Sequence, residues 1–391
     1  MLRSIRPRVV LMLGFVLSLV LALAGCGGGG GDTQANGSGV GSGGTGSYTN
    51  GPVSGLGSII VNGVRYDVSG AVVHRDDDAD DSVRHDASEV KVGMVVAVSG
   101  SGIVPAGTGV LPVAAAYTVR YGSSLIGPVS AVDGAGASIT VLGQTVRITS
   151  KTVQPASLSV NDVVEVHGLA DAMGGYTATR IDTLAGSTST YKIVALVDGV
   201  DSQAMRLGLN GNLTVSYAAL SLPVGVTPGA RVRVWFGANQ VNGQWSATRI
   251  LVDQPLVSDR EEASLEGLIT SLPQNSLMRV DGALVDVSRL SLPTLALGER
   301  VRVEGRLQAG VLVATELEGP NALEREETEL FGAVSQLTGQ TFVVRGVTVA
   351  YTPSVVEGNL ANGACVEVHG QGYNADGQLL ATEVNVHSSC N

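Results

Sequence analysis

Hydrophobic and polar residues alternate along most of the chain beyond residue 50, and the alternation returns in copies of one short unit. Each copy contains a strand that ends in Val-x-Val-x-Gly: Val96-Ala97-Val98-Ser99-Gly100, Val164-Glu165-Val166-His167-Gly168, Val301-Arg302-Val303-Glu304-Gly305 and Val366-Glu367-Val368-His369-Gly370. A looser copy, Val232-Arg233-Val234-Trp235-Phe236-Gly237, carries one extra residue. The closing glycines are spaced 65 to 69 residues apart. Such a period predicts tandem domains of one design.

A β-hairpin is predicted upstream of each Val-x-Val strand. Its tips read Asn62-Gly63, Leu142-Gly143, Asn210-Gly211, Asp281-Gly282 and Arg345-Gly346. Asn-Gly and Asp-Gly favour the two-residue turn in which both central residues take positive φ. A glycine-led strand such as Gly267-Leu268-Ile269-Thr270 opens every copy except the third, and a strand marked Ala-Thr, such as Ala314-Thr315, closes every copy except the first.

The fold class follows from the size of one unit. About five strands in roughly 65 residues, without a long amphipathic helix, would form an open sheet with an exposed apolar face and two free edges. Curling into a five-stranded barrel removes most of this exposure, and an OB-like barrel has this size and strand number. We therefore predict an all-β chain of five tandem small five-stranded OB-like β-barrels. SH3-like barrels or small sandwiches are the alternative.

The first residues have the pattern of a bacterial export signal. Three arginines precede the apolar run Val9–Ala24, which is shorter than the roughly 20 residues that a membrane span needs. The run ends in Leu23-Ala24-Gly25-Cys26, which resembles a lipobox. We therefore expect removal of residues 1–25 and acylation of Cys26, with palmitate among the acyl chains; an ordinary secretory signal with an incidental cysteine is the alternative. Residues 26–50, mostly Gly, Ser, Thr and Asn, predict a flexible tether.

The lipobox, the tether and the tandem units together resemble proteobacterial repeat lipoproteins built from a small β-domain of unknown function. The units carry this resemblance through Gly-x-Val/Ile, Val-x-Gly, Val-x-Val-x-Gly and Ala-Thr-x-Ile. The resemblance implies a location in the cell envelope and a barrel-like module, and it offers no activity and no catalytic residues. Glycine rather than an acidic residue follows Cys26, which favours the outer membrane. The predicted repeats are residues 51–121, 122–190, 191–257, 258–321 and 322–391.

The net charge argues against one class of partner. The chain has 24 basic and 35 acidic residues, a net charge of −11, and loss of the arginine-containing signal makes it more negative. Such a surface repels phosphate backbones, and an aromatic content of 4% leaves few platforms for stacking bases. We therefore expect no nucleic-acid partner. We expect the lipid bilayer, through acylated Cys26, and an unidentified envelope protein as partners.

The densest charge lies in one loop of the first repeat, His74–Asp81. Asp76, Asp78 and Asp80 have the alternate spacing that lets carboxylates converge on a hard cation such as Ca²⁺, but the loop lacks the glycine and distal glutamate of an EF-hand. A solvated loop is the favoured alternative. His85 also flanks the aspartates, so adventitious binding of a transition metal is a further alternative.

Both tryptophans, Trp235 and Trp245, lie in the third repeat, on strands expected to be adjacent and antiparallel about Gln240. The alternation places them on the outward face with Arg233 and Arg249, as a cross-strand pair. Such a pair could stack on a sugar ring or a partner side chain. These four residues are the candidate ligand site, and packing against a neighbouring repeat is the favoured alternative.

Two histidines, His167 and His369, occupy the same repeat position, just before the closing glycine. Other copies have Ser99 and Glu304 there. A position that accepts serine, glutamate and histidine is not a shared ligand site. We therefore predict that it is an exposed strand end.

Two cysteines, Cys365 and Cys390, remain once Cys26 is acylated. An exported chain meets oxidising conditions, so we predict a disulfide between them. The hairpin register of the third repeat, applied to the fifth, places Thr382 opposite Cys365. The tail would then have to fold back to bring Cys390 within the roughly 7 Å that a disulfide allows between Cα atoms.

The sequence offers little for catalysis. It contains no Gly-Lys-Ser/Thr phosphate loop, no His-Glu-x-x-His and no Gly-x-Ser-x-Gly, and its five histidines are not paired at ligand spacing. We therefore expect no catalytic residues and no cofactor, and a non-enzymatic, membrane-anchored envelope lipoprotein that acts as a multi-domain spacer or protein-binding array. A lipoprotein that binds a saccharide or small ligand through the third repeat is the main alternative. A carboxylate-based hydrolase, such as a glycosidase, is the weaker one.

Overall fold

The computed structural model of the chain describes residues 46–78, 80, 82–186, 188–253 and 258–390. The predicted signal peptide, Cys26 and nearly all of the predicted tether lie outside these residues. Strands dominate the described part, in which the helices are one α-helix of four residues and two short 3₁₀-helices. Within that part, no helix is long and apolar enough to cross a membrane.

The third repeat shows how one unit is built. Its first strand, β12 (Thr190–Asp201), pairs antiparallel with β13 (Arg206–Leu209) and with β15 (Arg231–Gly237). β13 forms a hairpin with β14 (Leu213–Ser216), which runs parallel to β16 (Trp245–Val252). Pairing of β16 with β15 completes a ring of five strands. The order 1-2-3-5-4 closes a barrel and is the order of an OB-like fold.

The same ring of pairings occurs in the other repeats. Repeat 1 uses β1 (Ser47–Leu56), β2 (Ile59–Val61), β3 (Val64–Asp67), β5 (Val95–Gly100) and β6 (Val113–Tyr121). Repeat 2 uses β7 (Leu125–Val132), β8 (Ser138–Val141), β9 (Gln144–Arg147), β10 (Val163–Ala170) and β11 (Tyr176–Thr183). Repeat 4 uses β17 (Arg260–Gln274), β18 (Leu277–Val280), β19 (Ala283–Asp286), β20 (Arg300–Gln308) and β21 (Val311–Glu318).

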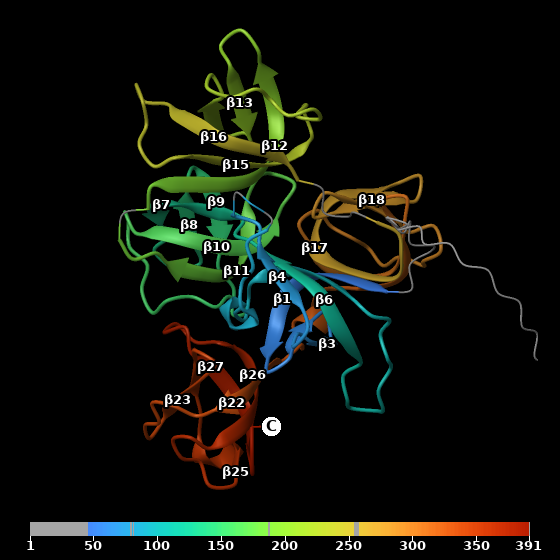
Figure 1. Cartoon of the computed structure of the whole chain (residues 1–391), viewed down its shortest axis with the longest axis vertical. Helices are drawn as coiled ribbons and strands as arrows, with labels where there is room; N and C mark the ends of the chain where they lie inside the picture. The colour runs from blue at the N-terminus through green and yellow to red at the C-terminus, as the bar shows by residue number, and fades with distance from the viewer. Residues whose placement is uncertain (1–45, 79, 81, 187, 254–257, 391) are drawn as a thin grey trace, which may run out of the picture. The chain divides into compact units, whose positions relative to one another are not determined.

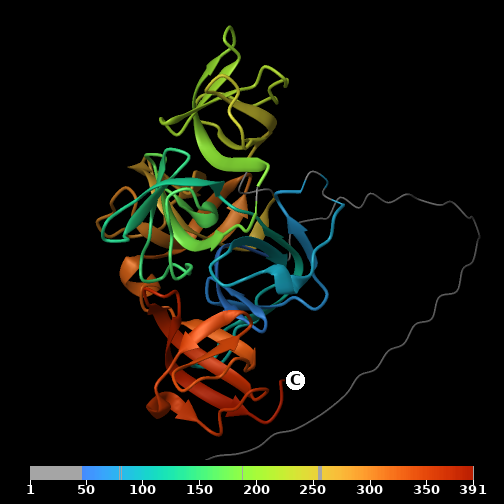
Figure 2. The same ribbon diagram turned by 90° about the vertical axis from the view of Figure 1, so that its left-hand side faces the viewer.

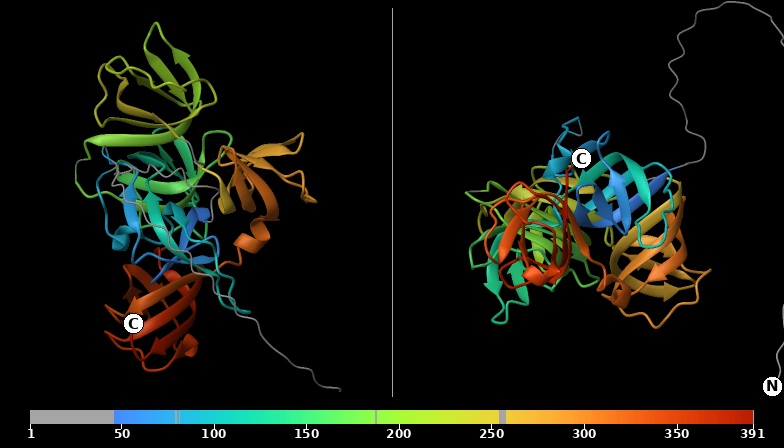
Figure 3. Two further views of the ribbon diagram at one scale, coloured as in Figure 1. Left: turned by 45° about the vertical axis from the view of Figure 1, so that its right-hand side comes forward. Right: turned by 90° about the horizontal axis from the view of Figure 1, so that it is seen from below.

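Repeat 5 uses β22 (Thr328–Ala333), β23 (Thr341–Val344), β24 (Val347–Ala350), β26 (Cys365–Tyr373) and β27 (Leu379–His387). A bridge between Ser335 and Val343 joins its first two strands. The shorter elements are β4 (Val72–Arg75), η1 (Ala87–Glu89), α1 (Pro320–Leu323), η2 (Pro353–Val355) and β25 (Val356–Glu357). In Figure 1 each stretch of colour gathers into its own curled sheet, and Figures 2 and 3 show this from other directions. The prediction of an all-β chain of repeated small barrels is confirmed.

The five hairpin tips have the predicted turn. Both central residues have positive φ in every copy: Asn62 50° and Gly63 72°, Leu142 51° and Gly143 77°, Asn210 49° and Gly211 72°, Asp281 48° and Gly282 79°, Arg345 51° and Gly346 79°. Glycine at the second position supplies this conformation without steric strain. The twist of this turn matches the twist of the strands, so the turn fixes the register of each hairpin.

A β-bulge explains the closing glycine. In repeats 1, 2, 4 and 5 the register between the fourth and fifth strands shifts just before this glycine, for example between His167 and Gly168 in repeat 2 and between Glu304 and Gly305 in repeat 4. A Cβ on Gly168 would lie 2.7 Å from the carbonyl oxygen of Thr177, and one on Gly305 would collide with the carbonyl oxygen of Val313. The glycine is therefore required by the close approach of another strand.

The third repeat departs from this pattern. Its bulge lies between Trp235 and Phe236, and Phe236 pairs with Ala247. Phe236 therefore occupies the glycine position and lies fully buried in the core. Gly237 still ends β15, and it is the extra residue of this copy because it lies one position after the bulge.

Strand pairing also joins different repeats. Ser47–Asn50 of β1 runs parallel to Glu262–Leu265 of β17, and the end of β1 runs parallel to the start of β22. β7 of repeat 2 also pairs with β12 of repeat 3, and these two strands are antiparallel. Residues 47–50, which the sequence assigned to the tether, belong to β1 and are held by backbone pairing with β5 and β17. Repeats 2 and 3 share one apolar core, whereas repeats 1, 4 and 5 have separate cores. Tyr48 of repeat 1 joins the core of repeat 4, and Val92 and Val153 of repeats 1 and 2 join that of repeat 5.

Candidate functional site

The aspartates of residues 76–80 are drawn to different partners. Asp76 lies 3.1 Å from Nη1 of Arg233 and 3.5 Å from Nη1 of Arg120, Asp78 lies 2.6 Å from Nε2 of His85, and Asp80 accepts the Ser82 N–H at 2.8 Å. Among the described residues, the oxygens of these three aspartates do not gather within the 4.8 Å of one another expected at a shared ion. The structure therefore does not assemble the predicted calcium site, because each carboxylate already serves a cation or a backbone donor.

This acidic loop covers the outward face of repeat 3. Asp77 forms an ion pair with Lys192 of β12, whose side chain is only 1% exposed. Nη1 of Arg249 on β16 donates to the carbonyl oxygen of Asp78 at 2.6 Å. Asp77 and Asp78 are therefore part of an interface between repeats 1 and 3, whereas Asp80 is exposed, as expected of a solvated loop.

Trp235 lies at the centre of that interface. The register places Lys192, Trp235 and Arg249 opposite one another on three adjacent strands. Lys192 Nζ lies 5.5 Å and Arg249 Cζ lies 4.5 Å from the centre of the indole ring, and Trp235 is 6% exposed. These cation–π contacts leave little of the ring available to a ligand.

Trp245 lies elsewhere. Its ring packs 5.5 Å from Tyr191 and 5.3 Å from Phe236, against the shared core of repeats 2 and 3. The predicted cross-strand pair of Trp235 and Trp245 is wrong, because the hairpin turns at Asn242-Gly243 rather than at Gln240, and the bulge after Trp235 shifts the register by one further residue, so Arg249 lies opposite Trp235. Arg233, the remaining member of the predicted site, points into a cleft.

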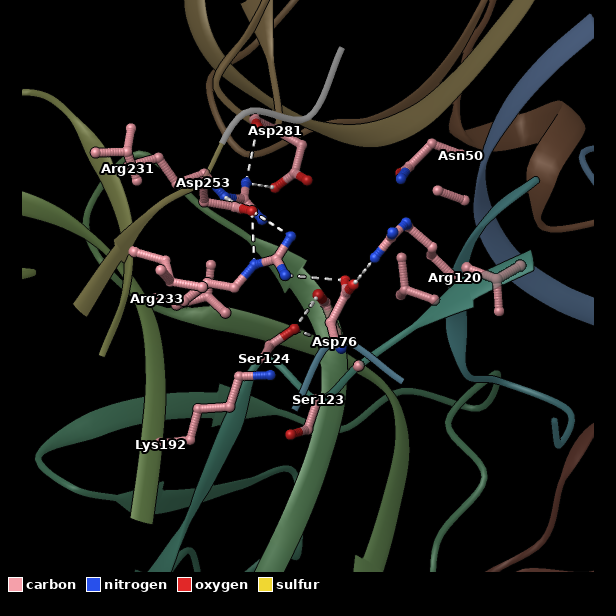
Figure 4. Close-up of a pocket in the computed structure, with 18 of the residues that line it drawn as sticks. Asn50, Asp76, Arg120, Ser123, Ser124, Lys192, Arg231, Arg233, Asp253 and Asp281 are labelled. Atoms are coloured by element: carbon pink, nitrogen blue, oxygen red, sulfur yellow. Dashed lines mark hydrogen bonds and ion pairs between the residues drawn. The ribbon is translucent and has the colours of Figure 1, made fainter. Parts of the chain in front are cut away.

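That cleft, with a volume of about 870 Å³, is lined by residues of repeats 1 to 4. A chain of ion pairs crosses it: Arg231 contacts Asp281 at 2.6 Å and Asp253 at 2.8 Å, and Arg233 contacts Asp253 at 2.6 Å and Asp76 at 3.1 Å. Figure 4 shows the alternation of guanidinium and carboxylate groups along this chain. Each of the two guanidinium groups lies between two carboxylates, so the chain links repeats 4, 3 and 1.

The environment sets the ionisation of these carboxylates. Burial raises the pKa of Asp281, although Arg231 opposes the change. For Asp253, burial also acts to raise the pKa, but Arg231 and Arg233 outweigh it and the pKa is lowered. Ser123, Ser124 and Lys192 add further polar groups to the lining. The lining of the cleft therefore includes charged groups of both signs and serine hydroxyl groups.

His167, close to this cleft, is not the exposed strand end that the sequence predicted. It is fully buried, and neither ring nitrogen has a hydrogen-bond partner among the described residues. The prediction is wrong because the acidic loop of repeat 1 and Lys192 cover this end of β10. Burial, with Lys192 adding to it, lowers the pKa of His167 to about 3. The residue is therefore neutral at physiological pH.

Repeat 5 places the equivalent histidine in a different environment. His369 is half-buried, and its ligand nitrogen lies with the carboxylates of Glu329 and Glu367 within 4.8 Å. Within the described part of the chain, Glu329, Glu367 and His369 form a group of side chains close enough together to hold a metal ion. Sequence reasoning missed it, although the shared Glu-x-His of β26 was a signal for it.

The predicted disulfide is present. Cys365 and Cys390 are bonded, with their Cα atoms 5.3 Å apart. The register predicted for this hairpin is wrong, because Cys365 lies opposite His387 and not Thr382. The bulge and the longer β27 bring the tail alongside Cys365, so a short turn after His387 is sufficient.

Two features of the site had weak or no signals in the sequence. Arg231 and Arg233 alternate with two buried valines, which places both guanidinium groups on one outward face and was a signal for the cleft. The partners of that face come from a loop in repeat 1 and a turn in repeat 4, for which no local signal exists. Cys26, the predicted lipidation site, lies outside the described residues.

The ring of five strands and its repetition define a class: tandem-repeat proteins built from small β-barrels. A family model described as "Domain of unknown function (DUF5666)" matches residues 50–104, 126–182, 266–318 and 331–385. These matches cover more than half of the chain, which therefore belongs to this family. They fall on repeats 1, 2, 4 and 5, and the third repeat, with Phe236 at the glycine position, is not matched.

Other comparisons add little. No curated protein matches the chain. A solved chain titled "drosophila Unr CSD456" is 14% identical, and the match covers 52% of this chain and 98% of that chain, with a TM-score of 0.13. A similarity this low carries no argument about fold or function.

Proposed function

We propose that this protein is a non-enzymatic lipoprotein of the bacterial cell envelope, anchored by acylated Cys26, whose barrels form a protein-binding array. The anchor rests on the lipobox-like Leu23-Ala24-Gly25-Cys26 and on the apolar run before it. Several acyl chains on one cysteine hold a protein firmly at a bilayer. The outer membrane is the proposed location.

One observation favours a protein-binding array over a simple spacer. Repeat 1 pairs its strand β1 with strands of repeats 4 and 5 and docks its acidic loop on repeat 3. A spacer needs contacts between successive units alone, whereas these contacts join units that are far apart in the sequence. Such an arrangement favours a defined surface built from several repeats, for which an envelope protein is the proposed partner.

The anchor is tested by replacing Cys26 with serine. Cys26→Ser should release the protein from membranes after a high-salt wash, and Gly27→Ser, next to it, is the matched control and should not. Affinity capture after cross-linking in intact envelopes tests the array. The control is the same signal and tether fused to an unrelated domain. A partner that is recovered with the barrels and not with the control supports the array; recovery of the same proteins with both would contradict it.

A second candidate, binding of a saccharide or another small polar ligand, is favoured by the cleft of about 870 Å³. The ligand would contact the charged groups of Arg233 and its neighbours rather than the tryptophans, because Trp235 is covered. A glycan array that compares the wild type with Arg233→Gln tests it. Identical profiles, or no binding at all, would contradict this candidate.

A further inference from the structure

The outward face of the last repeat collects glutamate and histidine side chains. β22, β26 and β27 are adjacent strands, and their register places Glu329 opposite His369 and His369 opposite Glu383. Glu367 lies two residues before His369 on β26, and side chains two residues apart on a strand point to the same face. The residues between them fill the core of the barrel. The cluster is therefore built on paired strands rather than on a loop.

Three of these side chains are close enough to share one ion. The ligand atoms of Glu329, Glu367 and His369 all lie within 4.8 Å of one another. Nε2 of His369 is 3.7 Å from Oε1 of Glu367, and Nε2 of His387 is 3.3 Å from the other oxygen of Glu367. Two carboxylates, one imidazole and a second imidazole beside them form a set that Zn²⁺ accepts in tetrahedral geometry.

Groups behind these side chains orient them. Nδ1 of His369 lies 3.5 Å from Oε2 of Glu327, so its two ring nitrogens face carboxylates on opposite sides. In metal sites a ligating histidine commonly directs its second nitrogen at a carboxylate, which fixes the ring and its tautomer. Arg65 Nη2 lies 2.5 Å from Oε1 of Glu329, which fixes this carboxylate and leaves its other oxygen for an ion.

Repeat 2 provides an internal comparison, because it has the same Val-Glu-Val-His-Gly sequence. There, cations of the protein itself contact the acidic groups: Arg75 lies 3.3 Å from Glu165, and Lys192 pairs with Asp77 beside His167. In repeat 5 the ion pairs of Glu367, within the described residues, are with His369 and His387. Glu367, the counterpart of Glu165, is therefore open to an external cation, because Arg65 contacts Glu329 instead.

We propose that repeat 5 binds one divalent transition-metal ion, with zinc as the favoured ion, through Glu329, Glu367 and His369. His387 completes the tetrahedron by a rotation of its side chain. The site lies on three paired strands next to the disulfide of Cys365, so binding a metal ion there crosslinks β22, β26 and β27.

Calorimetric titration of the full-length, tag-free protein in detergent with zinc chloride tests this proposal. We expect one equivalent of bound zinc, with affinity at least ten-fold weaker in Glu367→Gln and in His369→Gln. The matched control is His85→Gln, because His85 also lies between two carboxylates, Asp78 and Glu89, but outside repeat 5. It should bind zinc like the wild type. Absence of zinc binding by the wild type, equal binding by the two repeat-5 variants, or loss in the control would overturn the proposal.

A second measurement needs no variant and so does not depend on the variants folding. Diethyl pyrocarbonate modifies accessible histidines, and peptide mass spectrometry locates the modified residues. Zinc should reduce modification of His369 at least ten-fold and leave His85 unchanged. Equal modification of His369 with and without zinc, or equal protection of both histidines, would overturn the proposal.

Discussion

The pentapeptide Val-Glu-Val-His-Gly occurs twice, at Val164–Gly168 in repeat 2 and at Val366–Gly370 in repeat 5, and the two copies have opposite environments. In repeat 2 the histidine is fully buried, and Lys192 lies close to it. In repeat 5 the histidine is half-buried among glutamates. Both copies have the same strand, the same bulge and the same inward valines.

The difference comes from neighbours and not from the pentapeptide. The acidic loop of repeat 1 and Lys192 of repeat 3 cover the outward face in repeat 2, whereas Arg65 approaches one edge of that face in repeat 5. Repetition of a unit therefore conserves the barrel and leaves the outward face free to become either an interface or a binding site. Four changes should break or sharpen this comparison.

Removal of the buried cation should have the largest effect. Lys192→Met leaves Asp77 with much less compensation for its burial, and breaking a buried ion pair typically costs about 3–5 kcal/mol. Burial acts to raise the pKa of Asp77, but Lys192 and Arg75 outweigh it and hold that pKa below its usual value. Arg65→Met is the matched change at repeat 5; its side chain is 31% exposed, so we expect a loss below about 1 kcal/mol. Hydrogen exchange of β10 and β22 peptides measures both, and equal losses would contradict the comparison.

Loss of the disulfide should act on repeat 5 alone. The residue before the pentapeptide is Val163 in repeat 2 and Cys365 in repeat 5, where the disulfide closes a loop of 25 residues. Cys390→Ser should destabilise repeat 5 by about 3 kcal/mol, because the open chain gains conformational freedom when unfolded. Hydrogen exchange of β26 and β10 peptides should show faster exchange in β26 only. Two reactive thiols per chain in unreduced, denatured wild-type protein would contradict the bond itself.

Lowering the pH should destabilise repeat 2 through its buried histidine, His167. An unfolded chain binds a proton at His167 near the ordinary pKa of 6.5, whereas the folded barrel resists protonation until about pH 3. The free energy of unfolding should therefore fall as the pH drops through this window, by up to about 1.4 kcal/mol per pH unit. His167→Gln should flatten the profile of repeat 2 between pH 6 and 4, as followed by hydrogen exchange corrected for pH. A profile identical to that of the wild type would contradict burial of His167.

The smallest expected effect is the loss of stability on replacing the closing glycines of repeats 2 and 5, Gly168 and Gly370, by alanine. A Cβ on Gly168 meets backbone atoms, the Thr177 oxygen at 2.7 Å, whereas a Cβ on Gly370 meets Cγ of Leu379 at 2.6 Å, a side chain that can rotate. Gly168→Ala should cost about 1–3 kcal/mol and Gly370→Ala less, because backbone clashes are harder to relieve. Denaturant unfolding followed by peptide-level exchange compares them. A larger loss for Gly370→Ala would reverse the expected order.

The barrels were predictable because their signals are local. Alternating valines, the Asn-Gly and Asp-Gly tips and the Ala-Thr strand each act within a few residues, and together they specify the ring of strands. The Ala-Thr pair has a physical meaning that the pattern did not reveal: Ala178 lies opposite Gly168, and Thr179 is the extra residue of the bulge, with its hydroxyl donating to the His167 carbonyl at 3.1 Å.

The site was not predictable in the same way. Lys192 lies 115 residues from Asp77 along the chain, and Arg249 lies 171 residues from Asp78. No periodicity encodes such pairs, so the aspartates looked like a calcium loop and the tryptophans like an exposed pair. The turn at Asn242-Gly243 and the bulge after Trp235 together shift the register and separate Trp235 from Trp245.

The pairing of β1 with β17 and β22 has a consequence for the order of events in biosynthesis. β1 is synthesised well before its partners in repeats 4 and 5, which begin at residues 260 and 328. Until those strands emerge, the outer hydrogen-bonding groups of β1 form an unsatisfied edge that can recruit the wrong strand. Repeat 1 can close its own ring early, but its docking on the later repeats is a final step. A chain truncated before β17 would therefore leave this edge of β1 unpaired and available to strands of other molecules.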